Sequence, residues 1–461
     1  MRTRLVLLTG LLGSFIITLD VMIVGVSLPS IEADLGAGAT GLQWVVDAYT
    51  LAFAALLMAA GGVTDRIGAK KAYAIGVAVF TVASVVCGVA PEIEILIGAR
   101  LLQGAGAALM MPASVTLIST GFRDPAERAR AIGVWAVGGS IGAAAGPIVG
   151  GAMSAVSWRA VFLMNIPIGI IILVLLIGVG RSPTNAVKLS AAGHLAIFIA
   201  LGAATFVAIE GGVHGFTSGS VVVAAAAGLA AIIAFVALQK WGSRPVLPRK
   251  ILRSRNVILT SLVGFAAIGT LFGMVFLFSL YLQQARGLSS FEAGLVFMPM
   301  AVTAVGANIV SVRLAERWGP RSPVILGMLV SAVGLALLAF APSDAPPWWL
   351  AIVMVPAGMA GPLAMPSAIG LLVNSVSHEN SGTATALFNA IRQFGGATAV
   401  AVFGALIAGD LGMESGMRIG LILGVLCVVA AGVAALYLKP PVDVVLVSGP
   451  TPSAESDPVA N

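Results

Sequence analysis

The chain has 461 residues, of which 59% are hydrophobic and 10% are charged, and its formal net charge is +6. Soluble domains carry about 25% charged residues, so this composition lacks the polar exterior that a large soluble enzyme needs. It argues against soluble enzymes, nucleic-acid-binding proteins and disordered scaffolds. The lipid bilayer is the solvent that fits such a chain, and the excess of basic residues is better explained by membrane orientation than by binding to nucleic acid.

Apolar segments long enough to cross a bilayer follow one another along the chain. A membrane-spanning helix needs about 20 apolar residues, and none of these segments alternates in polarity as barrel strands do. The first begins after Met-Arg-Thr-Arg and continues through Ile31, which predicts a retained span and not a cleaved signal peptide. The predicted fold class is an all-α polytopic membrane protein with fourteen spans, near 6–29, 42–62, 72–90, 95–119, 131–154, 161–180, 189–210, 218–238, 257–283, 291–312, 323–341, 348–373, 382–408 and 418–438.

Basic residues are distributed unequally between the two sides of these spans. If the N-terminus is cytoplasmic, most Lys and Arg residues fall on the cytoplasmic side, as the positive-inside rule requires. Arg159, Arg286 and Arg418 then fall outside, and Arg100 and Arg392 lie within spans. We therefore expect a multi-pass protein with both termini cytoplasmic. The richness in alanine, glycine, valine and arginine favours a GC-rich bacterial genome, and hence the bacterial inner membrane.

A short charged motif occurs twice. Asp65-Arg66-Ile-Gly68 lies between the second and third spans, and Glu316-Arg317-Trp-Gly319 lies between the tenth and eleventh, 251 residues later. Parallel six-helix repeats are typical of secondary transporters. We expect an N-terminal six-helix bundle (1–180), two extra spans with a basic linker (181–256), a C-terminal six-helix bundle (257–438) and a disordered cytoplasmic tail (439–461).

Two acidic residues lie within the first two spans. Asp20 falls near mid-depth, where a carboxylate costs about 2.5–3.5 kcal/mol on insertion scales. It is either an acid satisfied by a neighbouring helix or a proton carrier, and we favour the carrier because burial makes protonation sensitive to surroundings. Asp47 lies about one and a half turns into the second span. It either faces a polar entrance or lies at the headgroup level, and the sequence leaves both alternatives open.

Arg100 heads one polar face of the fourth span. Gln103, Gly104 and Ala107 follow it at helical spacing, so this face combines polar groups with small residues that let a neighbour approach. Arg100 could snorkel to the interface, but intramembrane arginines usually face the protein interior. We expect Arg100 to face the interior and Gln103 to line a cavity.

The thirteenth span carries a comparable face. Asn389, Arg392 and Gln393 share it, and they either hydrogen-bond helices together or line the substrate path. We expect a mostly apolar cavity, because ligand sites are lined mainly by hydrophobic and aromatic side chains. The candidate aromatic residues are Trp135, Phe297 and Phe388.

The fifth span contains a row of glycines at a spacing of four. Such rows permit close contact between membrane helices. Pro147 removes one backbone donor and clashes with the carbonyl of Ala143, so it predicts a bend. The row is either a packing surface or a hinge and seal between the halves, and its candidate residues are Gly142, Gly146, Pro147, Gly150 and Gly151.

The two charged motifs have two possible roles. They are either solvated loops or ion pairs that hold one access state closed, and their candidate residues are Asp65, Arg66, Gly68, Glu316 and Arg317.

Several segments resemble one known family. Asp65-Arg66-Ile-Gly68 matches the hallmark loop of the major facilitator superfamily. Arg100 to Ala108 resembles its motif B, and Gly142 to Gly151 resembles motif C of drug:proton exchangers. Leu19 to Pro29 and Trp158 to Gly169 are similar to segments of its fourteen-helix drug:proton antiporters, a branch that includes methylenomycin and quaternary-ammonium exporters. Ala69 and Val312 depart from the family pattern in the two loops.

This resemblance implies two six-helix bundles with two extra central helices. It also implies that Arg100 assists proton release from a facing carboxylate, and that an acid at the position of Asp47 binds cationic drugs. No phosphate-binding loop, catalytic constellation or metal-ligand spacing is present in the sequence. We therefore expect no enzyme activity, no cofactor and no metal.

The predicted function is proton-coupled export of hydrophobic or amphiphilic drugs by alternating access, with Asp20, Asp47 and Arg100 as coupling residues. Expected partners are a small amphiphilic substrate, protons and membrane lipids, with no nucleic acid, and the expected state is a monomer. The alternative is a proton-coupled exporter or symporter of a lipid or metabolite with the same fold. A channel fits less well, because pores show filters or rings of like charge.

Overall fold

The structure is a computed structural model that describes residues 2–122, 124–180, 182–184, 190–242, 246–376, 381–408 and 412–439. All regular secondary structure in these ranges is helical. Thirteen segments within them are long and apolar enough to cross a membrane, and the bent helix α5 supplies a fourteenth. The all-α polytopic fold with fourteen spans is therefore confirmed. The predicted tail, apart from Lys439, lies outside the described residues.

The first six spans form one group of helices. Within it α1 packs along α5, and α4 packs between α2 and α3. The sixth span is divided at Met164 into two helices. The elements are α1 (Arg2–Leu35), α2 (Ala39–Ile67), α3 (Ala69–Val89), α4 (Ile93–Gly121), α5 (Pro125–Val156), α6 (Trp158–Leu163) and α7 (Asn165–Ile177).

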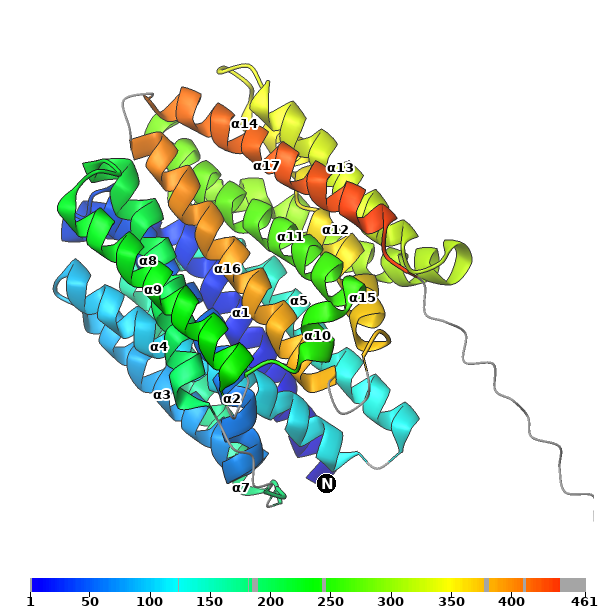
Figure 1. The fold of residues 1–461 in the computed structure, drawn as a ribbon. Helices are drawn as coiled ribbons and strands as arrows, with labels where there is room; N and C mark the ends of the chain where they lie inside the picture. Colours follow the sequence, from blue (N-terminus) through cyan, green and yellow to red (C-terminus); the bar gives the residue numbers. More distant parts are fainter. Residues whose placement is uncertain are drawn as a thin grey trace, which may run out of the picture.

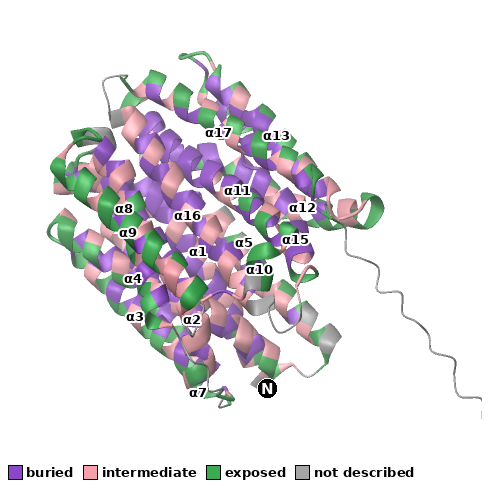
Figure 2. Cartoon of the chain, viewed as in Figure 1, coloured by how far each residue is buried: buried purple, intermediate pink, exposed green. Residues whose placement is uncertain are grey.

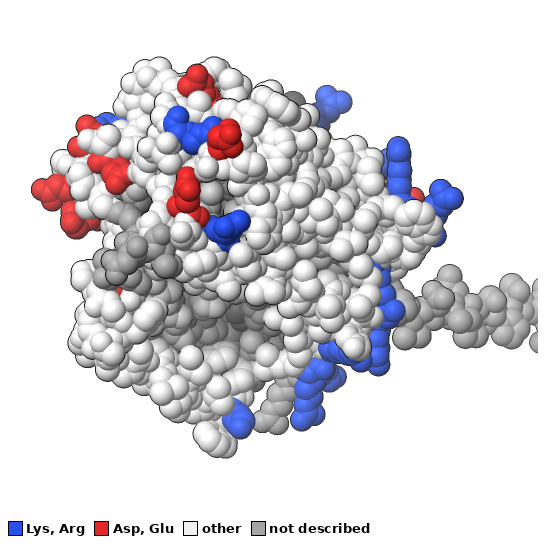
Figure 3. All heavy atoms as spheres, turned by 90° about the horizontal axis from the view of Figure 1, so that it is seen from above, with Lys and Arg blue, Asp and Glu red and all other residues white. Residues whose placement is uncertain are grey.

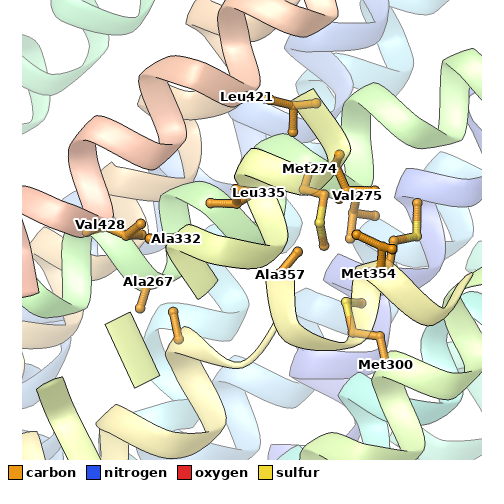
Figure 4. Packing of buried hydrophobic residues seen from close by; sticks show 14 of the residues in the cluster. Ala267, Met274, Val275, Met300, Ala332, Leu335, Met354, Ala357, Leu421 and Val428 are labelled. Atoms are coloured by element: carbon orange, nitrogen blue, oxygen red, sulfur yellow. The ribbon is translucent and has the colours of Figure 1, made fainter. Parts of the chain in front are cut away.

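The last six spans form a second group with its own apolar core. Figure 4 shows part of this core, in which Met274, Met300, Met354 and Leu335 come from four different helices. Methionine fills irregular gaps well because its side chain is unbranched. The elements are α11 (Arg255–Leu280), the π-helix η1 (Tyr281–Ala285), α12 (Ser290–Trp318), α13 (Ser322–Ala339), α14 (Pro347–Ala357), α15 (Ala360–Val373), α16 (Ser381–Ala408) and α17 (Gly412–Leu436).

A helical hairpin and a short helix connect the two groups in sequence. The hairpin consists of α8 (Ala191–His214) and α9 (Gly219–Trp241), and the short helix is α10 (Arg249–Arg253). The groups meet where α2 packs on α16, α5 on α12 and α1 on α11 (Figure 1). Helix α8 contacts both α2 and α16, so the hairpin covers the seam between these two helices.

The glycines of the two charged loops both have a positive φ. Gly68 has φ +86° and Gly319 has φ +82°, and each glycine separates two consecutive helices. Glycine adopts this conformation without the steric penalty of a side chain. The motif that recurs in sequence thus also recurs in structure, as a positive-φ glycine that ends one helix after an acid and an arginine.

The outward-facing surface is apolar along the length of the bundle. Figure 2 shows exposed residues on the outer faces of the peripheral helices. Large apolar side chains are among the exposed residues of the chain, such as Val82, Val223 and Val302, each at least 59% exposed. Charged side chains gather at the ends instead (Figure 3). We call the end where α1 begins the basic end, with exposed Lys71 and Arg317; the opposite end has exposed Asp34, Glu92 and Glu94. This distribution fits a bundle whose middle lies in lipid.

Helix α5 is bent by 41° between Arg130–Ala143 and Ala145–Val156. The bend adjoins Pro147, as the sequence predicts. In a straight helix the ring of Pro147 would clash with the carbonyl of Ala143. Glycines of α5 at a spacing of four face α1. A β-carbon added to one of them would collide with α1, and the pairs are Gly138 with Leu11, Gly142 with Phe15, Gly146 with Met22 and Gly150 with Ile23. Gly151 instead faces α12, where a β-carbon would lie 2.6 Å from the carbonyl oxygen of Ser290. The row therefore packs α5 mainly within its own group, and its last member lies at the contact with the second group.

We predict opposite effects for two glycine substitutions on α5. A β-carbon at Gly142 would lie 2.5 Å from the carbonyl oxygen of Phe15, whereas one at Gly133 would meet nothing within 4 Å. Gly142→Ala should therefore lower the free energy of unfolding by about 1–3 kcal/mol through overpacking. Gly133→Ala should be neutral or stabilising, because alanine is the better helix former. Thermal unfolding of both purified variants in detergent measures the difference, and equal melting temperatures would contradict the close contact.

Candidate functional site

A fully buried ion pair lies at the centre of the first group of helices. Asp20 on α1 pairs with Arg100 on α4, and the two side chains are 0% and 1% exposed. Gln103 Nε2 and Asn165 Nδ2 each donate to Asp20 Oδ1 at 2.8 Å. Ser84 Oγ accepts from Gln103 at 2.9 Å and from Asn165 at 3.3 Å. We call these five residues the Asp20 cluster.

The guanidinium of Arg100 is held on several sides. Its Nε donates to the carbonyl oxygen of Val45 at 3.0 Å, and its Nη1 donates to Gln103 Oε1 at 2.7 Å as well as to Asp20. The group also lies over the ring of Tyr49, 4.3 Å from the ring centroid. An arginine bound in this way faces the protein interior, so the snorkelling alternative is wrong.

Local sequence places the members of the cluster. Arg100 and Gln103 are three residues apart and so share one face of α4. Gly104 lies beside them and allows α2 to approach, because any side chain there would collide with the backbone of Tyr49. The break at Met164 starts α7 at Asn165, which directs that amide toward Asp20.

Gln103 does not line a cavity as predicted. It is completely buried, and its amide is used inside the Asp20 cluster. Two cluster members were not identified as site residues from the sequence. Asn165 lies in a segment that resembles the antiporter branch, and that resemblance was the available signal. No sequence signal identified Ser84, because serine is common in apolar helices, where its hydroxyl usually hydrogen-bonds to the backbone of its own helix.

Asp47 lies on α2, the helix that packs on α16 where the two groups meet, and is 0% exposed. In this conformation the carboxyl is therefore enclosed by protein and does not face an open entrance. Thr50 Oγ1 lies 3.5 Å from Asp47 Oδ1, and Oδ2 has no hydrogen-bond partner among the described residues. Gln43, one turn earlier, lies against Gly404 of α16, and neither atom of its amide group is bonded. One carboxyl oxygen and a whole amide group are thus buried here without hydrogen-bond partners among the described residues.

The polar face of α16 is partly open. Asn389 and Gln393 are 8% and 4% exposed, and Asn389 Nδ2 donates to the carbonyl oxygen of Thr385 at 2.9 Å. Arg392 retains partial exposure, and its Nε is buried without a hydrogen-bond partner.

The predicted aromatic cavity walls are largely wrong. Phe297 and Phe388 are 0% exposed and belong to apolar cores. Trp135 is half-buried, and its Nε1 donates to Ser114 Oγ at 3.0 Å between α4 and α5. Aromatic side chains in these spans are used for packing more than for lining a path.

The two groups are joined at the opposite end. Gln283 Nε2 donates to the carbonyl oxygen of Val26 at 3.0 Å, and the hydroxyls of Ser30 and Ser290 lie 3.3 Å apart. Gln284 donates to Glu32. These contacts tie α1 to η1 and α12, next to Gly151 on α5. They hold the two groups together at the end of the bundle that lies away from the basic end.

The charged loops at the basic end make no such connection. Within the described residues, Asp65, Arg66, Glu316 and Arg317 take part in no ion pair. Partial burial raises the pKa of the Asp65 carboxyl above its ordinary value. Arg317 lies over the ring of its neighbour Trp318, 5.6 Å from the centroid. The ion pairs that would close this end are absent from this state among the residues that the structure describes.

We predict that substitutions of Asp20 and Arg100 have non-additive effects on the free energy of unfolding. Arg100→Gln should lower the free energy of unfolding by about 3–5 kcal/mol, because it leaves a buried carboxylate without its cation. Adding Asp20→Asn to this variant should recover most of the loss, since the double variant buries no charge. Thermal unfolding of the wild type, both single variants and the double variant in nanodiscs gives the coupling energy. Additive losses would show that the two side chains act independently.

Comparisons with known proteins agree with this architecture. The sequence profile described as Major Facilitator Superfamily matches residues 10–400 and, in a second match, 313–459. Two solved structures share the fold: a D-xylose–proton symporter (TM-score 0.69, 14% identity, covering 96% of this chain and 99% of that one) and a bacterial homologue of the human lysosomal transporter Spinster (TM-score 0.66, 18% identity, covering 94% and 96%).

Three sequence relatives cover most of the chain. The methylenomycin A resistance protein of Streptomyces coelicolor is 35% identical over 94% of this chain and 91% of its own length. A protein of the same name from Bacillus subtilis is 35% identical over 87% of each. The multidrug resistance protein Stp of Mycobacterium tuberculosis is 33% identical over 88% of this chain and 76% of its own. With this profile match and these relatives, the chain belongs to the Major Facilitator Superfamily of membrane transporters.

Proposed function

We propose that this protein exports hydrophobic or amphiphilic small molecules in exchange for protons. Relatives that are named for resistance to methylenomycin A and to multiple drugs support an exporter. The observation that carries proton coupling is the buried Asp20–Arg100 ion pair. Intramembrane ionisable residues mark proton and substrate pathways, and in this pair a single cation, Arg100, balances the charge of the acid.

The pair provides a simple cycle. Protonation of Asp20 removes the negative charge that attracts Arg100. The guanidinium can then move away from Asp20 while it keeps its hydrogen bonds to Gln103 and to the Val45 carbonyl oxygen. When Arg100 returns, its positive charge favours loss of the proton. Gln103 and Asn165 hold Asp20 in place during both steps, because each donates to its Oδ1 oxygen.

Alternating access follows if the two groups rock as six-helix bundles, 1–180 and 257–438, with 181–256 between them. The contacts at the opposite end close the bundle there, so this conformation opens toward the basic end. We assign the basic end to the cytoplasm of a bacterial inner membrane, with both termini inside, since Lys and Arg gather there. In the other conformation, Asp65, Arg66, Glu316 and Arg317 would pair to close this end, and the bent, glycine-rich α5 would act as the hinge.

Asp47 is the second coupling residue of this proposal. Its carboxyl lies in the α2–α16 seam, which must change when the groups rock. One of its oxygens has no partner in this conformation, so movement of the seam alters its surroundings and therefore its charge. The hairpin α8–α9 covers this seam and separates the carboxyl from lipid.

We predict that Asp20→Asn abolishes transport that is driven by a pH gradient. The amide cannot carry a proton, although it preserves the shape of the side chain. The measurement is uptake of a lipophilic dye panel, containing cationic, neutral and anionic members, into everted vesicles with pH and electrical gradients imposed separately. Glu94→Gln, at an exposed acid of the opposite end, is the matched control and should transport normally. Proton-driven uptake by Asp20→Asn at the wild-type rate would refute the role of Asp20.

For Asp47→Asn we predict transport with one proton fewer per substrate molecule. The accumulation ratio reached at steady state should then depend less steeply on the imposed pH gradient. Proteoliposomes with a graded series of pH differences give this slope. Glu210→Gln is the control, because Glu210 lies at the end of the same seam and bonds Trp44 and His214 instead. An unchanged slope in Asp47→Asn would exclude Asp47 from coupling.

A further inference from the structure

Arg392 is an intramembrane cation without a counter-charge. It takes part in no ion pair within the described residues, and its Nε is buried with no hydrogen-bond partner. The residue is nevertheless not fully enclosed by the bundle, since its exposure is intermediate. An arginine in a membrane span is costly unless it pairs or faces water, and such residues mark pathways. Arg392 therefore differs from Arg100, whose charge is neutralised by Asp20.

No described acid on the helices packed against α16 compensates this charge. Helices α11 and α15 contain no acidic residue. On α8 and α17 the acids are Glu210, which is paired with His214, and Glu414, which is exposed at the start of its helix. Helix α2 carries Asp47 and Asp65, and its contact between Gln43 and Gly404 sets the register with α16. At 1.5 Å per residue, both acids lie roughly 12 Å or more from the level of Arg392 along the helix axis.

Two neutral hydrogen-bond donors lie near Arg392 in the sequence and packing of α11 and α16. The Ser261 hydroxyl on α11 is buried without a partner, one turn before Gly264, which lies against the base of the Arg392 side chain. The Gln393 amide makes no hydrogen bond within the described residues, although this residue is only 4% exposed. A guanidinium, an amide and a hydroxyl can all donate to an oxyanion. We call Ser261, Arg392 and Gln393 the α16 donor set.

We infer that the transported compounds include amphiphiles that bear a carboxylate, and that the α16 donor set binds this group. The inference rests on the proposed function, because it names the substrate class of the same pathway. A single cation with neutral donors neutralises the one negative charge of a carboxylate. It would leave one of the two negative charges of a phosphate dianion without a counter-charge. Arginine binds carboxylates through two parallel hydrogen bonds, which fixes the orientation of the bound group. The apolar helices on either side of this set would contact the rest of the molecule.

Binding to the full-length protein in nanodiscs tests this inference without transport. The probes are a dansyl-labelled medium-chain carboxylic acid and its methyl ester, which differ in charge and share the apolar part. We expect the wild type to bind the acid about tenfold or more tightly than the ester. Arg392→Gln should remove this preference, and Arg392→Lys should keep part of it, because lysine retains the charge and loses the bidentate geometry. Equal binding of acid and ester by the wild type would overturn the inference.

Two further variants guard against a folding defect in Arg392→Gln. Ser261→Ala and Gln393→Ala should each weaken binding of the acid several-fold and leave binding of the ester unchanged. Arg418→Gln is the matched control, because Arg418 lies at the opposite end, where its Nε donates to the carbonyl oxygen of Ala339. It should bind both probes as the wild type does. Unchanged acid preference in Arg392→Gln, with helix content and melting temperature preserved, would overturn the inference.

Transport separates this inference from the proposed function. If everted vesicles take up neutral or cationic dyes with the pH gradient but never the acid, the inference fails and proton-coupled export stands. If no dye moves with the pH gradient while the acid still binds through Arg392, proton-coupled export fails and the carboxylate site stands.

Discussion

The ion pair between Asp20 and Arg100 is the constraint on which the first group of helices depends. Neither charge could be buried alone in this setting, since each would cost several kcal/mol without its partner. Their burial requires side chains from α1 and α4, the Asn165 amide of α7, the Ser84 hydroxyl of α3 and a backbone carbonyl of α2. One interaction thus fixes the relative positions of five helices. A change in its protonation is therefore felt by all of them.

The surroundings of α1 connect this pair to the rest of the bundle. Glycines of α5 let α1 lie against its backbone, and the 41° bend of α5 lies beside that contact. The far end of α1 meets η1 and α12 through Val26 and Ser30. A displacement of α1 at Asp20 would therefore reach the closed end through a packed helix. Because side chains at close glycine contacts cannot interpenetrate, this coupling favours discrete states over gradual deformation.

The two arginines within spans illustrate how different environments give the same residue different roles. Arg100 is enclosed and neutralised, with its donors engaged by Asp20, Gln103 and a carbonyl. Arg392 is only partly enclosed, and it has an unbonded Nε and no acid at its level among the described residues. In the function that we propose, the first arrangement would store and release a proton, and the second would offer a charge to a ligand.

The sequence by itself determined the spans, their order and the motif repeated at Gly68 and Gly319, because hydrophobic length and charge placement act locally along the chain. It also identified Asp20 and Arg100 as unusual, since a charge in an apolar run is visible without a fold. Only the tertiary structure decided that these two side chains pair, that Ser84 and Asn165 complete their cluster and that Gln103, Phe297 and Phe388 are packed inside. It also decided that Asp47 lies in a seam and that Arg392 has no counter-charge among the described residues. These properties depend on which helix faces meet across tens or hundreds of residues, and helical periodicity specifies a face but not its neighbour.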